Sequence, residues 1–250
     1  MRFAGEGRGN SAKAVVFKPN LVAAALLSLI FTSAPAAHRS AWLVIGYSVE
    51  HRPITARAIG DGPRTVLVVG SIAGDEPGGI AVAEDLSRLA PTRGVTVWVL
   101  PDVNPDGLAR HTRVNAHGVD LNRNFPFRWR GGRGAGRYYP GLHASSEPEA
   151  RAVEGFVGRI RPALTVWLHQ PYALIDDSQG PRWAESFLGR ATGLPVEPLP
   201  DYPGSAIGWE DALAPHSAFD VELPGPTLDG STARGYAADL HLLLAAFAAR

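Results

Sequence analysis

The segment Asp120-Leu-Asn-Arg-Asn-Phe-Pro126 places an amide and a guanidinium side by side, within a region rich in glycine and proline. The guanidinium of arginine is planar, and its paired N–H groups match the two oxygens of a carboxylate in a way that lysine does not. Asn122 and Arg123 are therefore predicted to form a receptor for a carboxylate. Such a receptor is typical of a peptidase that recognises the free C-terminus of a peptide.

Other polar residues follow predicted strands at the points where those strands end. Buried strands are predicted at 64–72, 95–100, 163–168 and 218–223. The polar residues at their ends are Asp75 and Glu76, Asn104 and Asp106, His169, and Glu222. Ligands of α/β sheets bind at the carboxyl ends of strands, so these side chains are expected to meet at one site. Each of them alone is more often structural, and it is the joint pattern that favours function.

Helices are predicted between these strands, at 77–89, 146–160, 181–191 and 231–249. Ser146 and Glu149 have the spacing of a capping box, which predicts the start of the second of these helices. Strands that alternate with helices predict an α/β layered fold. Residues 101–144 form a long loop-rich segment that contains the carboxylate receptor, and loops of this length in a compact domain are usually functional or disordered.

The composition excludes several classes of function. The 250 residues suit one domain, and the 24 basic residues balance the 24 acidic ones, which argues against a nucleic-acid partner bound through a net positive field. The chain has no cysteine, so thiol catalysis, disulfides and cysteine-ligated metal sites are excluded. Any metal ion must be held by histidine, aspartate and glutamate.

The N-terminal residues differ from the rest of the chain. Four basic residues precede an apolar stretch from Leu21 to Phe31, and small residues with the spacing of a cleavage site follow in Thr32-Ser-Ala-Pro-Ala-Ala37. This pattern predicts a secretory signal, and hence a secreted or extracytoplasmic protein. The apolar stretch is shorter than the roughly 20 residues of a membrane-spanning helix. Residues 1–37 are interpreted as a signal peptide or an N-terminal membrane anchor, with a disordered tail as the alternative, and residues 42–250 as the folded domain.

Taken in order, six motifs of this chain resemble those of the zinc carboxypeptidases. The motifs are Gly70-Ser-Ile-Ala-Gly-Asp-Glu-Pro77, Asn104-Pro-Asp-Gly107, Gly118-Val-Asp-Leu-Asn-Arg-Asn-Phe-Pro126, Ser146-Glu-Pro-Glu149, Trp167-Leu-His169 and Val221-Glu-Leu-Pro224. Within that family the chain looks most similar to the bacterial murein peptide amidases, over roughly residues 42 to 248. The resemblance implies a three-layer α/β/α sandwich with a mixed, largely parallel central sheet. It also implies hydrolysis of an amide bond next to a free C-terminal carboxylate in short peptides, including peptides derived from peptidoglycan.

The resemblance also implies a role for each motif residue. Glu76 and His169 correspond to ligands of one zinc ion, and Glu222 corresponds to the general base that activates a water molecule. Asn122 and Arg123 correspond to the receptor for the terminal carboxylate of the substrate. Arg113 corresponds to the group that polarises the scissile carbonyl. A cation beside a developing oxyanion stabilises the transition state, and a carboxylate beside an activated water can carry its proton.

The chain departs from the family at the first ligand motif, His-x-x-Glu, which here reads Ala73-Gly-Asp-Glu76. Catalytic zinc usually has three protein ligands, and only two remain. Three interpretations are open at this point. Asp75 or His143 replaces the missing histidine, or zinc binds weakly, or the protein is a degenerate member that binds peptides or cell wall without cutting. An acylamino-acid deacylase of the family's sister branch is a further alternative.

Overall fold

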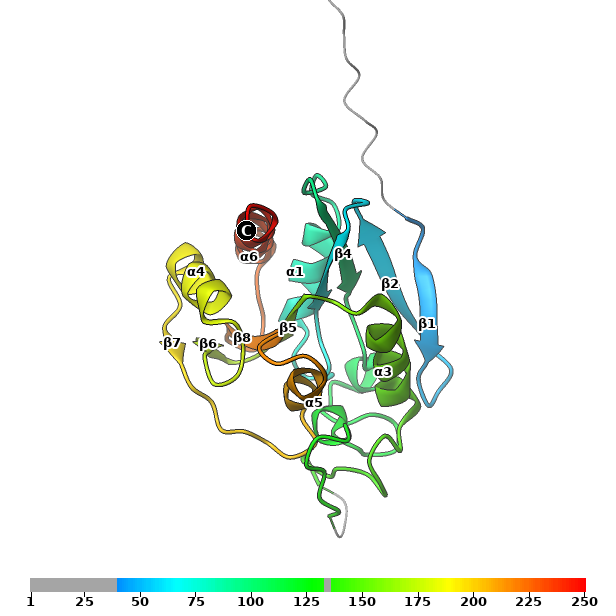
Figure 1. Cartoon of the computed structure of the whole chain (residues 1–250). Helices are drawn as coiled ribbons and strands as arrows, with labels where there is room; N and C mark the ends of the chain where they lie inside the picture. Colours follow the sequence, from blue (N-terminus) through cyan, green and yellow to red (C-terminus); the bar gives the residue numbers. More distant parts are fainter. Residues whose placement is uncertain (1–39, 133–135) are drawn as a thin grey trace, which may run out of the picture. The chain divides into compact units, whose positions relative to one another are not determined.

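The computed structural model describes residues 40–132 and 136–250 of the chain (Figure 1). These residues belong to the compact unit Pro35–Arg250. The expected signal segment, residues 1–37, lies outside the described residues. In the part of the chain that is described, no helix is long and apolar enough to cross a membrane.

Eight strands form one mixed sheet in the order β1-β2-β4-β3-β5-β8-β6-β7. Their bounds are β1 Leu43–Tyr47, β2 Pro53–Ile59, β3 Arg64–Val69, β4 Val95–Leu100, β5 Leu164–His169, β6 Tyr172–Asp176, β7 Val196–Glu197 and β8 Ala218–Pro224. The central strands β4, β3, β5 and β8 run parallel, whereas β1, β2 and β6 join the sheet through antiparallel pairs. The predicted mixed, largely parallel sheet is confirmed.

Helices cover both faces of this sheet, as Figure 1 shows. One face carries α1 (Gly78–Leu86), α4 (Arg182–Thr192) and α6 (Gly230–Ala248), whose apolar side chains share a core with alternate residues of the central strands. The other face carries α3 (Pro148–Ile160) and α5 (Ala206–Leu213), which pack on Leu67, Trp167 and their neighbours. Central strands buried on both faces explain the nearly continuous apolar runs in the sequence.

The capping-box prediction for the helix after residue 145 is wrong. Helix α3 starts later than expected, its N-cap residue is Glu147, and no side chain caps it. The hydroxyl of Ser146 instead donates to Glu147 Oε1 at 2.6 Å. Glu149 is fully buried and accepts hydrogen bonds from the backbone of Val49 and the amide of Asn115. Glu149 therefore ties α3 to neighbouring loops.

Residues that follow β4 tie down the long loop. The side chain of Asn104 caps the short helix α2 (Pro105–Arg110) by accepting from the Gly107 N–H at 2.9 Å, and its amide donates to the carbonyl of Arg113 at 3.0 Å. Asp106 is fully buried and accepts from the hydroxyl of Ser48 at 2.8 Å. Neither Asn104 nor Asp106 lines the cavity that the other predicted site residues share, so the expectation that all the strand-end residues meet at one site is wrong for these two.

Candidate active site

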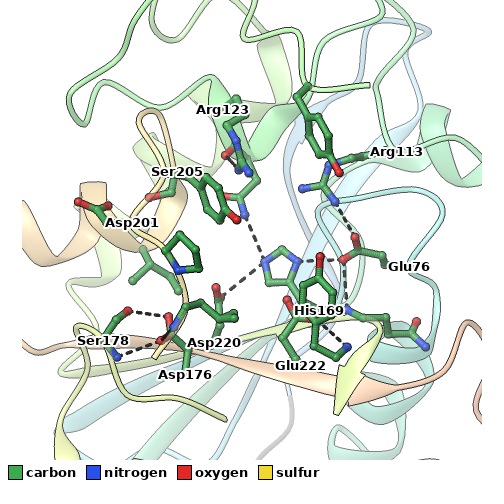
Figure 2. Close-up of a pocket in the computed structure, with 18 of the residues that line it drawn as sticks. Glu76, Arg113, Arg123, His169, Asp176, Ser178, Asp201, Ser205, Asp220 and Glu222 are labelled. Carbon is green, nitrogen blue, oxygen red and sulfur yellow. Dashed lines mark hydrogen bonds and ion pairs between the residues drawn. The ribbon is translucent and has the colours of Figure 1, made fainter. Parts of the chain in front are cut away.

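A cavity of about 460 Å³ opens at the carboxyl ends of β3, β5 and β8 (Figure 2). The sequence-predicted residues Glu76, Arg113, Asn122, Arg123, His169 and Glu222 all line it. Its other charged residues are Arg137, Asp176, Asp201 and Asp220. Figure 2 shows Arg113 and Arg123 above the ring of His169, and Asp220 and Glu222 below it. Residues from 76 to 222 thus converge on one site.

Strand register explains how two of these residues meet. His169 is the last residue of β5 and pairs with Glu222 on the parallel strand β8. Side chains two residues apart on a strand point to the same face, so Asp220 lies on the same side of β8 as Glu222. Both carboxylates consequently lie beside His169, and the charge of each raises the pKa of that histidine.

Glu76 and His169 contact each other directly. The Nδ1 atom of His169 lies 2.9 Å from Glu76 Oε2, and the backbone N–H of Gln170 donates to the same oxygen at 3.3 Å. Burial alone would raise the pKa of Glu76, but the hydrogen bond from His169 and the charges of His169 and Arg113 lower it below its usual range. Burial likewise opposes the charged form of His169, yet Asp220, Glu76 and Glu222 raise its pKa to about 9.

Arg113 reaches the same pair from the long loop. Its Nη1 donates to Glu76 Oε1 at 2.6 Å, and its Nε donates to Asp120 Oδ2 at 2.8 Å. Burial would lower the pKa of Arg113, but the carboxylates of Asp120 and Glu76 raise it above its usual value. The guanidinium is therefore a fixed positive charge, held in place at two of its nitrogen atoms.

Asn122 and Arg123 form the opposite wall. The Asn122 Oδ1 atom accepts from the Ala206 N–H at 2.9 Å, which directs its amide nitrogen toward His169 Nε2, 3.4 Å away. Arg123 donates from Nη1 to the carbonyl of Asn122 at 2.6 Å and lies over the ring of Tyr202, 4.1 Å from its centroid. Burial lowers the pKa of Arg123. The described contacts of this guanidinium include no carboxylate ion pair, as expected for an anion receptor.

Glu222 and Asp220 bring two carboxylates to the floor of the cavity. Glu222 is 6% exposed, and burial raises its pKa above its usual range. Asp220 Oδ1 lies 3.6 Å from His169 Nε2 and has no hydrogen-bond partner. Burial raises the pKa of Asp220 to about 7. The sequence predicted Glu222 but missed Asp220, although its charge within an apolar strand was a signal.

Asp75 and His143 do not join the cluster, and the prediction that either replaces the missing histidine is not supported. Asp75 pairs with Arg137 at 2.6 Å, and the exposed ring of His143 bonds to the carbonyl of Ala144 at 2.9 Å. Neither residue lines the cavity. Ala73, at the position of the missing ligand, is buried and offers no side-chain donor.

Comparisons with known proteins agree with this architecture. Residues 36–175, more than half of the chain, match the zinc carboxypeptidase family. Murein peptide amidase A from Escherichia coli K12 is 32% identical over 193 residues, which span 71% of this chain and 78% of that protein. The crystal structure of murein-tripeptide amidase from Escherichia coli O157 is 30% identical, with a TM-score of 0.67 over 84% of this chain and 93% of that one.

More distant structures share the fold. The structure of bovine thrombin-activatable fibrinolysis inhibitor, in complex with tick carboxypeptidase inhibitor, superimposes with a TM-score of 0.69 over 84% of this chain and 89% of that one, at 19% identity. The fold and the pocket are those of a hydrolase whose active site lies at the carboxyl ends of the strands of a mixed sheet. The chain belongs to the zinc carboxypeptidase family.

The residues of this pocket do not fit the zinc ion that the family implies. A catalytic zinc needs three protein ligands with one open position. Residues 40–132 and 136–250 contain no group of three or more histidines, aspartates or glutamates arranged to hold a metal ion. Ala73 supplies no ligand, and both oxygens of Glu76 accept hydrogen bonds from protein groups. The described residues therefore lack one of the three ligands that a catalytic zinc requires.

Proposed function

We propose that this protein hydrolyses an amide bond next to a free carboxylate in short peptides, with cell-wall peptides as its substrates. The observation that carries the proposal is one cavity that combines a carboxylate receptor, Asn122 and Arg123, with a buried glutamate, Glu222, and a second fixed arginine, Arg113. Family membership and the amidase relatives support the same reaction. They favour it over a purely binding protein and over a deacylase.

Binding begins at the arginine wall. The terminal carboxylate of the peptide accepts hydrogen bonds from Arg123 and from the amide of Asn122. Because Arg123 is buried, water competes weakly for its N–H groups, and a charge-assisted hydrogen bond there is strong. The ring of Tyr202 supports one face of the guanidinium. This contact fixes the position of the substrate relative to Glu222.

The chemical step uses the other two groups. Glu222 accepts a proton from water as the water oxygen attacks the scissile carbonyl carbon. The carbonyl oxygen gains negative charge and faces Arg113, whose guanidinium is already in place and needs no rearrangement. The C–N bond then breaks, and the proton held by Glu222 passes to the leaving amine. The products are a carboxylate and a free amine.

The proposed substrate class follows from the relatives and from the charges of the cavity. The two relatives with 30% identity or more described above are named for amidase activity on murein peptides. The cavity of this chain is lined by the arginines Arg113 and Arg123 and by the carboxylate Asp176. A peptide that carries both carboxylate and amino groups near the scissile bond, as diaminopimelate peptides do, matches both kinds of charge.

The proposal is tested with the purified protein and a tripeptide that contains the γ-D-glutamyl-diaminopimelate bond. Mass spectrometry is expected to detect the released amine product, and the same peptide amidated at its C-terminal carboxylate is expected to be a poor substrate. Equal cleavage of both peptides contradicts the carboxylate receptor. Failure to cleave this tripeptide and a broad panel of carboxylate-ended peptides contradicts the hydrolase.

We further propose that the protein is exported, with residues 1–37 as the signal segment. The basic residues, the apolar stretch and the small residues up to Ala37 support this proposal. Peptidoglycan lies outside the cytoplasmic membrane, so export would bring the enzyme to its proposed substrate.

A further inference from the structure

We propose that ion pairs within the protein take the place of the metal ion in this pocket. Five side chains, alternately acidic and basic, form a continuous row across the cavity: Asp120, Arg113, Glu76, His169 and Asp220. The first four are joined by hydrogen bonds of 2.6 to 2.9 Å, and Asp220 completes the row at an ion-pair distance of 3.6 Å. The pocket thereby keeps its shape without zinc.

Glu76 is the central residue of the row. One of its oxygens accepts from Arg113, and the other accepts from His169 and from the backbone of Gln170. A carboxylate with both oxygens bound to protein donors has no need of a metal ion to offset its burial. To bind zinc, Glu76 would have to exchange these contacts for the metal.

Both ring nitrogens of His169 also face protein groups. Nδ1 lies against Glu76, and Nε2 faces Asp220 Oδ1 at 3.6 Å and the amide of Asn122 at 3.4 Å. Since these two directions lie on opposite sides of the ring, no single ion can contact Glu76 and Asp220 through the same nitrogen. Asp220 is therefore placed as an ion-pair partner of His169 and not as a third ligand beside Glu76.

Hydrogen bonds within the loop at Ala73 hold its conformation. The carbonyl of Ala73 accepts from the backbone N–H of Glu76 at 2.9 Å and from the hydroxyl of Ser71 at 2.8 Å. These hydrogen bonds fix the turn that presents Glu76 to the cavity. A metal–histidine bond is not needed to hold this turn, and the small side chain packs in the core.

Two consequences follow. The thermal stability of the protein is independent of zinc, since a ligand that does not bind the native state cannot stabilise it. The binding of a carboxylate-ended peptide is also independent of zinc. This second consequence rests on the proposed function, whereas the first does not.

The test uses the full chain, freed of metal by a chelator and then divided into samples with and without added zinc. Zinc per chain is measured by atomic emission, and Tm is measured by differential scanning calorimetry. Calorimetric titration of the Glu222→Gln variant, which is expected to bind but not to cut, with the dipeptide γ-D-glutamyl-diaminopimelate gives Kd under both conditions. The variant Asp220→Asn removes the charge at the end of the row, and Asp201→Asn, a carboxylate at the cavity that pairs with Arg128 outside the row, is the matched control.

The native protein is expected to hold no stoichiometric zinc and to have the same Tm in both samples. Asp220→Asn is expected to lower Tm by several degrees in both samples, while Asp201→Asn leaves it within a degree of the native value. One zinc per chain with a raised Tm overturns the proposal, and so does an Asp220→Asn variant as stable as the control. Absence of dipeptide binding in every sample contradicts the proposed function and leaves the zinc result to decide this inference.

Discussion

Arg113 and Arg123 come from the same long loop but are held in different ways. Arg113 is fixed at two nitrogen atoms by carboxylates, whereas Arg123 is held by a backbone carbonyl and by the ring of Tyr202. Arg113 is therefore a permanent positive charge that is already paired with protein carboxylates. The arrangement of Arg123 leaves a buried guanidinium able to bind a ligand carboxylate. The difference supports the proposal that Arg113 stabilises the oxyanion and that Arg123 recognises the substrate.

Replacement of Arg123 by lysine is expected to weaken substrate binding more than catalysis. Lysine keeps the charge but loses the paired N–H groups and the flat face that lies on Tyr202. A charge-assisted hydrogen bond contributes roughly 1.5–3 kcal/mol, so KM is expected to rise about tenfold to a hundredfold. Steady-state kinetics on the diaminopimelate tripeptide checks this result. Arg88→Lys, in the exposed turn that follows α1, is the control, and an unchanged KM for Arg123→Lys contradicts the receptor.

Replacement of Glu222 by glutamine is expected to abolish proton transfer and to preserve binding. The amide keeps the size of the side chain but is too weak a base to take a proton from water. General base catalysis contributes roughly a hundredfold to ten-thousandfold, so kcat is expected to fall by that factor. Kinetics gives kcat, and calorimetric titration gives Kd. Glu197→Gln, on the exposed strand β7, serves as the control. A Glu222→Gln enzyme with native kcat contradicts the assignment.

Introduction of histidine at Ala73 is expected to create zinc affinity that the native chain lacks. One ligand of a structural zinc site is worth roughly 3 kcal/mol, about a hundredfold in affinity. The new imidazole would compete with Arg113 and His169 for Glu76 and shift the balance toward the metal. Zinc per chain and peptide hydrolysis are measured before and after the change. A folded variant that gains no zinc contradicts this prediction. It would mean that the ion pairs of Glu76 are more stable than its bond to zinc even with a third ligand present.

At the scale of elements, regular apolar patterns were predictable and short or irregular pieces were not. The strand predicted at 95–100 coincides with β4, and the predicted helices at 77–89, 181–191 and 231–249 contain or nearly match α1, α4 and α6. Strands β1 and β2 were missed because they lie at the antiparallel edge of the sheet, where exposed residues interrupt the apolar pattern. Helix α5 was missed because the turn that precedes it, Tyr202 to Ser205, dominates the local signal.

The candidate site was predictable to a similar degree. Six pocket residues were predicted, on three different grounds. Glu76, His169 and Glu222 follow predicted strands, Asn122 and Arg123 form an adjacent amide and guanidinium, and Arg113 was identified by the family resemblance alone. The sequence assigned Asn104 and Asp106 to the pocket wrongly, since a cap and a loop anchor use the same residue types as a binding site. The ion pairs across the cavity could not be predicted, because they depend on distances between segments far apart in the chain.

Glu210 on α5 is expected to make the stability of the fold depend on pH. It is 2% exposed and accepts from Thr165 and Trp167 of β5, and burial raises its pKa from 4.5 to about 7. A raised carboxyl pKa favours the neutral form in the native state. The resulting stability is fully present below pH 4.5 and is lost as pH rises to about 7, by roughly 3 kcal/mol in all.

Glu210→Gln is expected to remove this dependence. The amide carbonyl can accept from the indole of Trp167, and the amide N–H can donate to the hydroxyl of Thr165, so the local packing is kept. Denaturant unfolding near pH 4.5 and at about pH 8 gives the free energy of unfolding. As pH rises, the free energy of unfolding of the variant is expected to increase relative to that of the native protein. Glu84→Gln, on an exposed helix face, is expected to follow the native curve. Parallel curves for native and Glu210→Gln contradict the prediction.

At the scale of the whole molecule, the site depends on both halves of the chain. The receptor and Arg113 come from the loop after β4, whereas His169, Asp220 and Glu222 come from β5 and β8. The pairing of β3 with β5, and of β5 with β8, fixes the distance between these groups. The cavity is therefore a product of the complete sheet, and a fragment that lacks β8 would lose the proposed base and the partner of His169 together.

Export is the prediction that concerns the molecule in its cell. When the full chain is expressed in a bacterium, we expect the mature protein outside the cytoplasm, with a new N-terminus between Ala34 and His38. Replacement of Ala34, Ala36 and Ala37 by leucine is expected to block processing, because the cleavage site requires small residues. Mass spectrometry of the N-terminal peptide in each cell fraction checks both outcomes. An unprocessed chain in the cytoplasm contradicts export, whereas an unprocessed chain in the membrane fraction identifies residues 1–37 as an anchor and still places the proposed hydrolase beside the cell wall.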